Sequence, residues 1–250
     1  MKYKLFSILR GGMLAVVLAV TLGACAQSPA NRDAAKDSDS TMVRLPQKVS
    51  ILGDSYSTFE GWLSSPEYLA WYKPVPKDGR PTDVTKVEQT WWKIFIDENG
   101  YELEKNNSFS GSTVCNTGYG GKDYSSQSFV TRLSDLGNPD IILVFGGTND
   151  DWAGSPMGDY VYSDWTTEQL YSYRPATAYM LSELQQRHPQ ALIVVMINDI
   201  LRPEVTDSTI EICRHYGVPY VQLKDIDKIS DHPSLKGMRK IADQLEETLK

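Results

Sequence analysis

Four short segments of the sequence carry residue types that could take part in acyl transfer. They are Gly53-Asp54-Ser55, Ser110-Gly111-Ser112, Gly147-Thr148-Asn149-Asp150 and Asp231-His232-Pro233. A serine in the tight turn after a strand can project its hydroxyl above a sheet, and a glycine lets a backbone N–H face a ligand. An asparagine amide can donate to a developing negative charge. Each segment alone is more often an ordinary turn, so it is their combination that predicts a catalytic site.

The four segments need elements that bring them together, and the sequence predicts a parallel sheet. Strand-like runs are expected at Lys48–Leu52, Tyr101–Phe109, Ile141–Phe145, Leu192–Ile197 and Val218–Leu223. Helical patterns are expected at Glu88–Glu98, Ser126–Leu136, Thr167–Arg187 with a kink at Pro175, Pro203–Tyr216 and Leu235–Lys250. Repeated alternation of strands and helices is typical of a mostly parallel sheet with helices on both faces. Ligands of such sheets bind at the carboxyl ends of the strands, where the four segments fall.

The order Ser55, Gly111, Asn149 and His232 resembles the four sequence blocks of the SGNH (GDSL-type) hydrolase family. The resemblance implies that Ser55 is the nucleophile and that His232 is the general base. It also implies an oxyanion hole made by the backbone N–H groups of Ser55 and Gly111 and by the Asn149 side chain. The expected activity is that of a carboxylic ester hydrolase with no cofactor.

The likeness covers residues 43–250 and extends to details of the helices. Trp91-Trp92 and Lys236-Gly237-Met238 make the sequence look most like the lipase/acylhydrolase-like branch of exported bacterial lipoproteins. The resemblance implies a three-layer α/β/α, flavodoxin-like fold with a five-stranded parallel sheet of order 2-1-3-4-5.

One position departs from the family pattern. The family has an Asp three residues before the histidine, and this chain has Ile229 there. Asp227 and Asp231 are the candidates for a third triad member, although neither has the expected spacing. The alternative is a Ser-His dyad in which a backbone carbonyl, for example that of Ile229, fixes the imidazole tautomer.

Two aromatic-rich stretches give the only indication of a substrate. Trp62 belongs to the long segment after Ser55, and Trp152 lies just beyond Asn149. Aromatic rings beside an active site can stack on sugars, so the expected substrate is a small-molecule or glycan ester with a short acyl group, such as acetyl on a carbohydrate. Most of these rings could instead serve packing. A catalytically inactive, glycan-binding surface lipoprotein and a lipid-directed lipase are the alternatives.

The N-terminal segment is predicted to direct export. Basic residues precede the apolar run Met13–Leu22, which has the length of a signal-peptide core, and Leu22-Gly23-Ala24-Cys25 resembles a bacterial lipobox. We therefore expect a signal peptide at 1–24, a flexible tether at 25–42 that carries a lipidated Cys25, and a hydrolase domain at 43–250. The protein is expected to be an exported bacterial lipoprotein that is anchored to a membrane, on the outer membrane or periplasmic face if the organism is Gram-negative.

Composition excludes several other classes. The chain has 250 residues, 25 Lys and Arg, 32 Asp and Glu, and a net charge of −7, with no basic cluster that would bind nucleic acid. Its three cysteines are too few for a disulfide framework, and Cys115 and Cys213 are expected to be buried free thiols. None of the three histidines is spaced as part of a metal-ligand pair, so no metal is expected.

Overall fold

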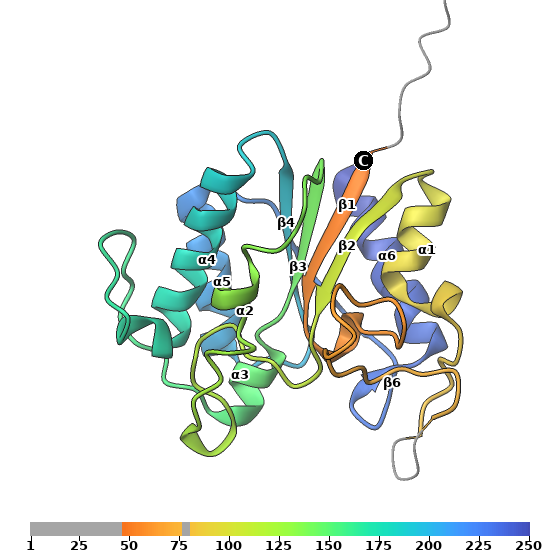
Figure 1. Cartoon of the computed structure of the whole chain (residues 1–250), viewed down its shortest axis with the longest axis horizontal. Coiled ribbons are helices and arrows are strands. Elements are labelled where there is room, and N and C mark those ends of the chain that lie inside the picture. The colour runs from red at the N-terminus through yellow and green to blue at the C-terminus, as the bar shows by residue number, and fades with distance from the viewer. Residues whose placement is uncertain (1–46, 77–80) are drawn as a thin grey trace, which may run out of the picture. The chain divides into compact units, whose positions relative to one another are not determined.

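The computed structural model of the protein describes residues 47–76 and 81–250, so the predicted signal peptide, tether and Cys25 lie outside the described residues. Five parallel strands form the central sheet in the order β2-β1-β3-β4-β5 (Figure 1). The strands are β1 (Lys48–Gly53), β2 (Glu102–Ser108), β3 (Ile141–Phe145), β4 (Leu192–Ile197) and β5 (Tyr220–Gln222). The predicted α/β class and the strand order 2-1-3-4-5 are confirmed.

Helices cover both faces of this sheet and complete three layers (Figure 1). The α-helices are α1 (Trp91–Glu98), α2 (Phe129–Arg132), α3 (Thr148–Ala153), α4 (Tyr173–Arg187), α5 (Pro203–Tyr216) and α6 (Leu235–Leu249). Short 3-10 turns occur at η1 (Ser55–Ser57), η2 (Val87–Gln89), η3 (Tyr119–Gly121) and η4 (Gln169–Tyr171). Helices α1 and α6 pack on one face, and α2, α4 and α5 pack on the other. None of the helices within the described part of the chain is both long and apolar enough to cross a membrane.

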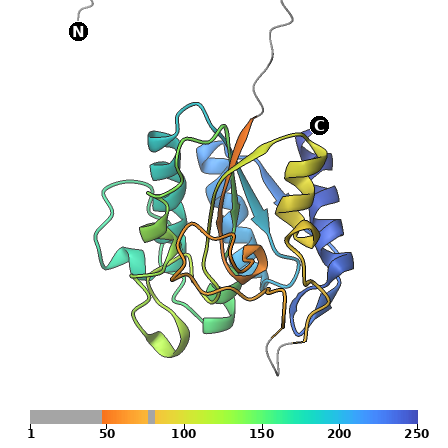
Figure 2. The same ribbon diagram turned by 45° about the vertical axis from the view of Figure 1, so that its right-hand side comes forward.

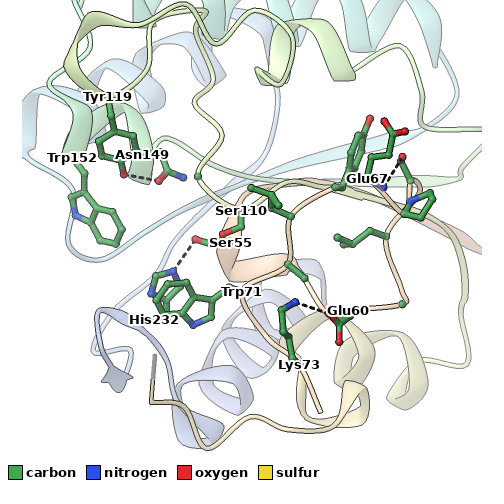
Figure 3. Close-up of a pocket in the computed structure, with 18 residues that line it drawn as sticks. Ser55, Glu60, Glu67, Trp71, Lys73, Ser110, Tyr119, Asn149, Trp152 and His232 are labelled. Carbon is green, nitrogen blue, oxygen red and sulfur yellow. Dashed lines mark hydrogen bonds and ion pairs between the residues drawn. The ribbon is translucent and has the colours of Figure 1, made fainter. Parts of the chain in front are cut away.

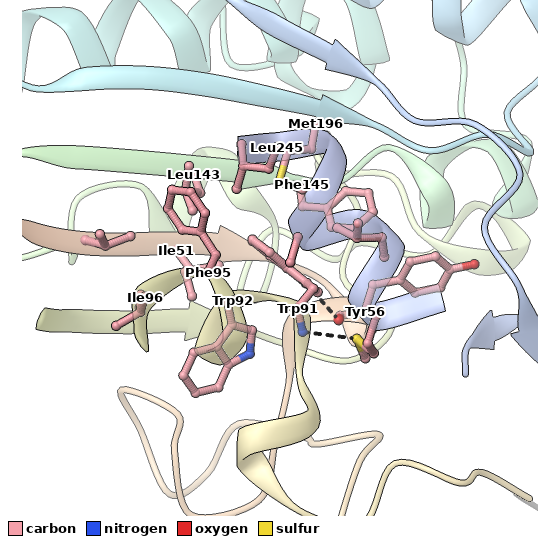
Figure 4. Packing of buried hydrophobic residues seen from close by; sticks show 14 of the residues in the cluster. Ile51, Tyr56, Trp91, Trp92, Phe95, Ile96, Leu143, Phe145, Met196 and Leu245 are labelled. Carbon is pink, nitrogen blue, oxygen red and sulfur yellow. Dashed lines mark hydrogen bonds between the residues drawn. The ribbon is translucent and has the colours of Figure 1, made fainter. Parts of the chain in front are cut away.

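The alternation of side chains along the strands divides the apolar core between the two faces. Ile51 of β1 faces the α1 and α6 layer, and Leu52 faces the α2, α4 and α5 layer. Figure 4 shows Trp91 of α1 close to Tyr56, and the Trp91 Nε1–H donates to the Tyr56 carbonyl at 3.1 Å. Because Tyr56 follows Ser55, this core contact fixes the turn that carries the serine.

Several local predictions were wrong. The helix expected from Thr167 begins only at Tyr173, after the turn η4, and Pro175 lies in its first turn. A proline there interrupts no helical hydrogen bond, so it does not act as the expected kink. The helix expected over residues 126–136 is reduced to α2.

The carboxyl ends of the strands lead into long connections that gather at one end of the sheet. Figures 1 and 2 show the segments after β1 and β2, together with α3, at this end. The fold therefore places the four predicted segments at one edge of the sheet.

Cys115 and Cys213 are both buried and free, as expected.

Candidate active site

Ser55 and His232 meet at this edge although they are 177 positions apart in sequence. Ser55 is the first residue of η1, which directly follows β1, and its Oγ lies 2.9 Å from Nε2 of His232 (Figure 3). The Asp54 side chain caps the turn by accepting from the Tyr56 N–H at 3.0 Å. Both side chains are buried, with 3% of Ser55 and 5% of His232 exposed. The hydroxyl is thus within hydrogen-bonding distance of a base.

A two-residue hairpin turn presents the imidazole. His232 lies in β7 (His232–Pro233), which pairs with β6 (Lys228–Ile229) in an antiparallel arrangement. Ser230 and Asp231 between them have φ of 51° and 60°, as in a type I′ turn. The turn places the Ser230 carbonyl 2.9 Å from Nδ1 of His232. Since a carbonyl only accepts, this contact favours a proton on Nδ1 and leaves Nε2 to accept from Ser55.

The two carboxylates that the sequence suggested as triad members are directed elsewhere. The Asp227 carboxylate accepts from the Ser234 hydroxyl, and Ser234 caps α6. Asp231 is exposed, and its backbone carbonyl accepts from the Tyr56 hydroxyl. Neither carboxyl hydrogen-bonds to His232 within the described part of the chain. The carbonyl beside Nδ1 belongs to Ser230 and not to Ile229.

An aromatic ring covers the imidazole. The Trp71 ring stacks on His232 with 3.5 Å between the ring centroids and 5° between the planes. Trp152 approaches the same imidazole edge-on, with centroids 6.1 Å apart, and it is 40% exposed. Sequence reasoning missed Trp71 as a neighbour of the histidine, because no local pattern links the two positions.

Gly111 and Asn149 line the same cleft as Ser55, and each has an N–H group that can donate to an oxyanion. Gly111 has φ of 87°, a conformation that favours glycine, and its backbone N–H donates to no acceptor within residues 47–76 and 81–250. The Asn149 amide nitrogen donates to the Ser112 carbonyl at 3.0 Å, and its oxygen accepts from the Tyr119 hydroxyl at 2.8 Å. Because a carbonyl cannot donate, the pair of contacts fixes which end of the amide carries the nitrogen. Figure 3 shows that nitrogen on the side of Ser55.

Asn149 lies in the first turn of α3. The residue before α3, Gly147, has φ of 92° and ends the turn that follows β3. Tyr119 was not identified from the sequence, because its partnership with Asn149 spans 30 positions and depends on the η3 turn.

A cleft of about 690 Å³ opens above these residues. It is lined by Ser55, Glu60, Gly61, Leu63, Ser65, Pro66, Glu67, Tyr68, Leu69, Ala70, Trp71, Lys73, Ser110, Gly111, Tyr119, Asn149, Trp152 and His232. Most of the lining comes from the segment after η1, where Glu60 and Lys73 form an ion pair at 2.5 Å. Trp62, a predicted substrate contact, is 41% exposed and lies near Trp92 rather than among the lining residues. Trp152, the other predicted contact, does line the cleft.

Two buried carboxyls, those of Asp54 and Asp150, lie next to the site, and their surroundings raise their pKa values. Burial raises the pKa of Asp54 to about 7 and that of Asp150 to about 6. Asp150 accepts from the backbone N–H groups of Val114 and Cys115 at 2.7 and 3.1 Å, so it anchors the chain that follows Gly111. Among the described residues, no cluster of three or more His, Cys, Asp or Glu side chains could hold a metal ion.

Comparisons with known proteins place these features in a family context. Residues 47–249 match the family model of the GDSL-like lipase/acylhydrolases. A Bacteroides uniformis structure classed as a GDSL-like lipase is 57% identical, with a TM-score of 0.80, and the match covers 82% of this chain and 95% of that one. A Bacteroides ovatus structure of the same class is 51% identical, with a TM-score of 0.81, over 82% of this chain and 99% of that one. A comparison with curated proteins found no match.

A more distant structure shares the fold alone. It is a family two carbohydrate esterase from Clostridium thermocellum in complex with cellohexaose, 17% identical, with a TM-score of 0.53. The match covers 83% of this chain and 65% of that one.

Proposed function

The chain belongs to the GDSL-like lipase/acylhydrolase family and is an ester hydrolase, and on this premise we propose that it removes a short acyl group, such as acetyl on a carbohydrate, through an acyl-Ser55 intermediate. The observation that carries the proposal is the 2.9 Å contact between Ser55 Oγ and His232 Nε2 in a buried position at the floor of an open cleft.

The proposed reaction uses the contacts described above. Nε2 of His232 takes the Ser55 proton as the oxygen attacks the ester carbonyl, and the Ser230 carbonyl holds the proton on Nδ1. The negative oxygen of the tetrahedral intermediate is stabilised by the backbone N–H groups of Ser55 and Gly111 and by the Asn149 amide. His232 then protonates the leaving alcohol, and a water molecule that it deprotonates releases the acyl group from Ser55.

The cleft walls support a polar substrate with a small acyl group. Glu60, Lys73 and Glu67 bring charges to the wall formed by the segment after η1, and Trp152 adds an exposed ring close to His232. A hydroxyl-rich alcohol can hydrogen-bond to such a wall, whereas a long acyl chain lying along it would remove these charges from water. The fold shared with a carbohydrate esterase that binds cellohexaose agrees with a glycan ester as substrate.

A substrate panel tests this proposal. Acetylated xylan, p-nitrophenyl acetate, p-nitrophenyl palmitate and phospholipid vesicles are each incubated with the wild type and with Ser55→Ala. We expect acetate release from xylan and p-nitrophenyl acetate by the wild type alone. Turnover only of palmitate or phospholipid would instead identify a lipase. A folded wild type that binds xylan but hydrolyses none of the four substrates would favour the non-catalytic binding protein.

We also propose that the protein is exported and anchored to a membrane through a lipid on Cys25, on the strength of the lipobox-like sequence. Growth with an alkyne fatty acid tests the anchor. The label should appear on the wild type and on Cys115→Ser, and it should be lost in Cys25→Ser. Equal labelling of wild type and Cys25→Ser would contradict a lipid on this cysteine.

A further inference from the structure

A buried arginine, Arg132, lies behind the cleft and is not among the residues that line it. It ends α2 and is 4% exposed. Its guanidinium carbon is 6.0 Å from the centroid of the Tyr68 ring, and Tyr68 lines the cleft. The charged group is therefore separated from the cleft by one side chain.

All five N–H donors of Arg132 have acceptors. Nε donates to the Gln127 carbonyl at 2.8 Å, and Nη1 donates to the Asn107 carbonyl and, at 2.9 Å, to the Asn107 side-chain oxygen. Nη2 donates to the Gly53 carbonyl at 3.0 Å and to the Ser112 hydroxyl at 2.9 Å. A guanidinium has five donors in one plane, so this set uses its full capacity.

Four of these acceptors, all except the Gln127 carbonyl, belong to the segments that carry the site. Gly53 ends β1 and lies two positions before Ser55, and Asn107 lies near the end of β2. Ser112 follows Gly111, and the Ser112 carbonyl accepts from the Asn149 amide nitrogen. One side chain thus connects the turn of the nucleophile, the glycine turn and, through Ser112, the asparagine.

All five acceptors of Arg132 are neutral, and the nearby Asp54 carboxyl interacts with its charge electrostatically. Burial lowers its pKa to about 10, which leaves the guanidinium charged at neutral pH. A positive charge in a poorly solvated place favours the negative tetrahedral intermediate over the neutral ester.

We propose that Arg132 is a positioning residue of the oxyanion hole. It holds the end of β1 and the Gly111–Ser112 turn at the spacing that lets the Ser55 and Gly111 N–H groups and the Asn149 amide reach one oxygen atom. This inference rests on the proposed acyl-transfer function. Lysine cannot replace it, because an ammonium group offers three donors and lacks the planar fork.

Arg132→Lys tests the proposal, with Arg174→Lys as the matched control. Arg174 also uses all three of its nitrogens as donors, to Ser208, Gly158 and Glu204, but lies outside the cleft lining. We expect Arg132→Lys to lower kcat for p-nitrophenyl acetate by about 10- to 100-fold with little change in KM, as for loss of stabilisation confined to the transition state. The affinity for methylboronic acid, which forms a negative tetrahedral adduct with a serine, should fall by a similar factor. Arg174→Lys should change neither value.

Ser112→Ala removes one acceptor of Arg132 and provides the second variant if Arg132→Lys does not fold. It should lower kcat by about 2- to 10-fold, as expected for one hydrogen bond, and the loss should be smaller in an Arg132→Lys background. A folded Arg132→Lys with wild-type kcat and boronate affinity, or Ser112→Ala with unchanged kcat, would overturn the proposal. A wild type no more active than Ser55→Ala would instead contradict the proposed function itself.

Discussion

At the residue scale, the imidazole of His232 is oriented by groups other than the two acids nearest in sequence. The Ser230 carbonyl lies beside Nδ1, and the Trp71 ring covers one face. A carbonyl fixes the tautomer as a carboxylate would, and the face of an indole ring attracts an imidazolium. These two contacts therefore orient the His232 imidazole and favour its protonated form.

Replacing the two acids separately tests this account of His232. Asp231→Asn and Asp227→Asn should each keep kcat within about twofold of wild type, because neither carboxyl hydrogen-bonds to the imidazole within the described residues. In Asp227→Asn, the oxygen of the introduced amide can still accept from the Ser234 hydroxyl. Steady-state kinetics on p-nitrophenyl acetate measures the two effects. A loss of about 10⁴ in kcat for either variant would be the signature of a triad carboxylate.

The Asn149 amide is expected to act in the transition state, and Tyr119 to orient it. Asn149→Ala should lower kcat by about 10² to 10³ without unfolding the protein, because it removes one oxyanion donor. Tyr119→Phe removes only the hydroxyl that holds the amide oxygen, so kcat should fall by about 2- to 10-fold. Measuring both kcat and the thermal unfolding temperature of each variant separates a loss of catalysis from a loss of structure. A larger loss of kcat in Tyr119→Phe than in Asn149→Ala would contradict the assignment of Asn149 as the donor and of Tyr119 as the residue that orients it.

At the element scale, the site is formed where β1 turns into η1 and the chain leaves β2. Gly53 pairs with Ser108 of β2 and Phe145 of β3, so it lies between two neighbouring strands. A Cβ atom there would lie 2.5 Å from Ser108 Oγ and 2.7 Å from Ser57 Cβ. The glycine is required because the turn packs directly against its neighbours.

Gly53→Ala should therefore lower the free energy of unfolding by about 1–3 kcal/mol through overpacking, and it should also lower kcat because the displaced backbone carries Ser55. Gly100→Ala is the control, since φ there is 64° but no atom lies within 4 Å of the added Cβ. The control should lose stability by about 1 kcal/mol and keep its kcat. Urea unfolding and kinetics measure the two effects. An unaltered kcat in Gly53→Ala would show that the turn tolerates the displacement.

The elements also show what the sequence can predict. Buried parallel strands are runs of apolar residues such as Ile141–Phe145, so the sheet and its order follow from local patterns and a family resemblance. The hairpin that presents His232 has two residues per strand and no Gly in its turn, which leaves no local signal. The contacts of Trp71 and Arg132 are formed between distant segments, and sequence spacing carries no information about them.

At the scale of the whole molecule, ionisable groups are buried beneath the site and couple its stability to pH. Asp54 is fully buried, and its Oδ2 has no hydrogen-bond partner within the described residues. Burial raises its pKa from 3.8 to about 7, so the folded state holds a proton that the unfolded state has lost. The stability contributed by this proton is complete below pH about 4 and is lost as the pH rises through about 7.

Asp54→Asn should therefore weaken the fall in the free energy of unfolding between about pH 5 and pH 8, because the amide cannot ionise and can still accept from the Tyr56 N–H. Burial also raises the pKa of Asp150, to about 6. Asp150 therefore adds a further fall in the free energy of unfolding as the pH rises, and Asp54→Asn retains this part of the fall. Denaturant unfolding at the two pH values gives both slopes. Identical slopes in wild type and Asp54→Asn would show that Asp54 does not titrate in this range in the folded protein.

The central claim, that Ser55 is a nucleophile activated by His232, is tested most directly by labelling with a fluorophosphonate and locating the adduct by peptide mass spectrometry. We predict a single adduct on the peptide that contains Ser55 in the wild type, slower labelling in His232→Ala, and no adduct in Ser55→Ala. A folded wild type that forms no adduct, or an adduct that persists in Ser55→Ala, would contradict the claim.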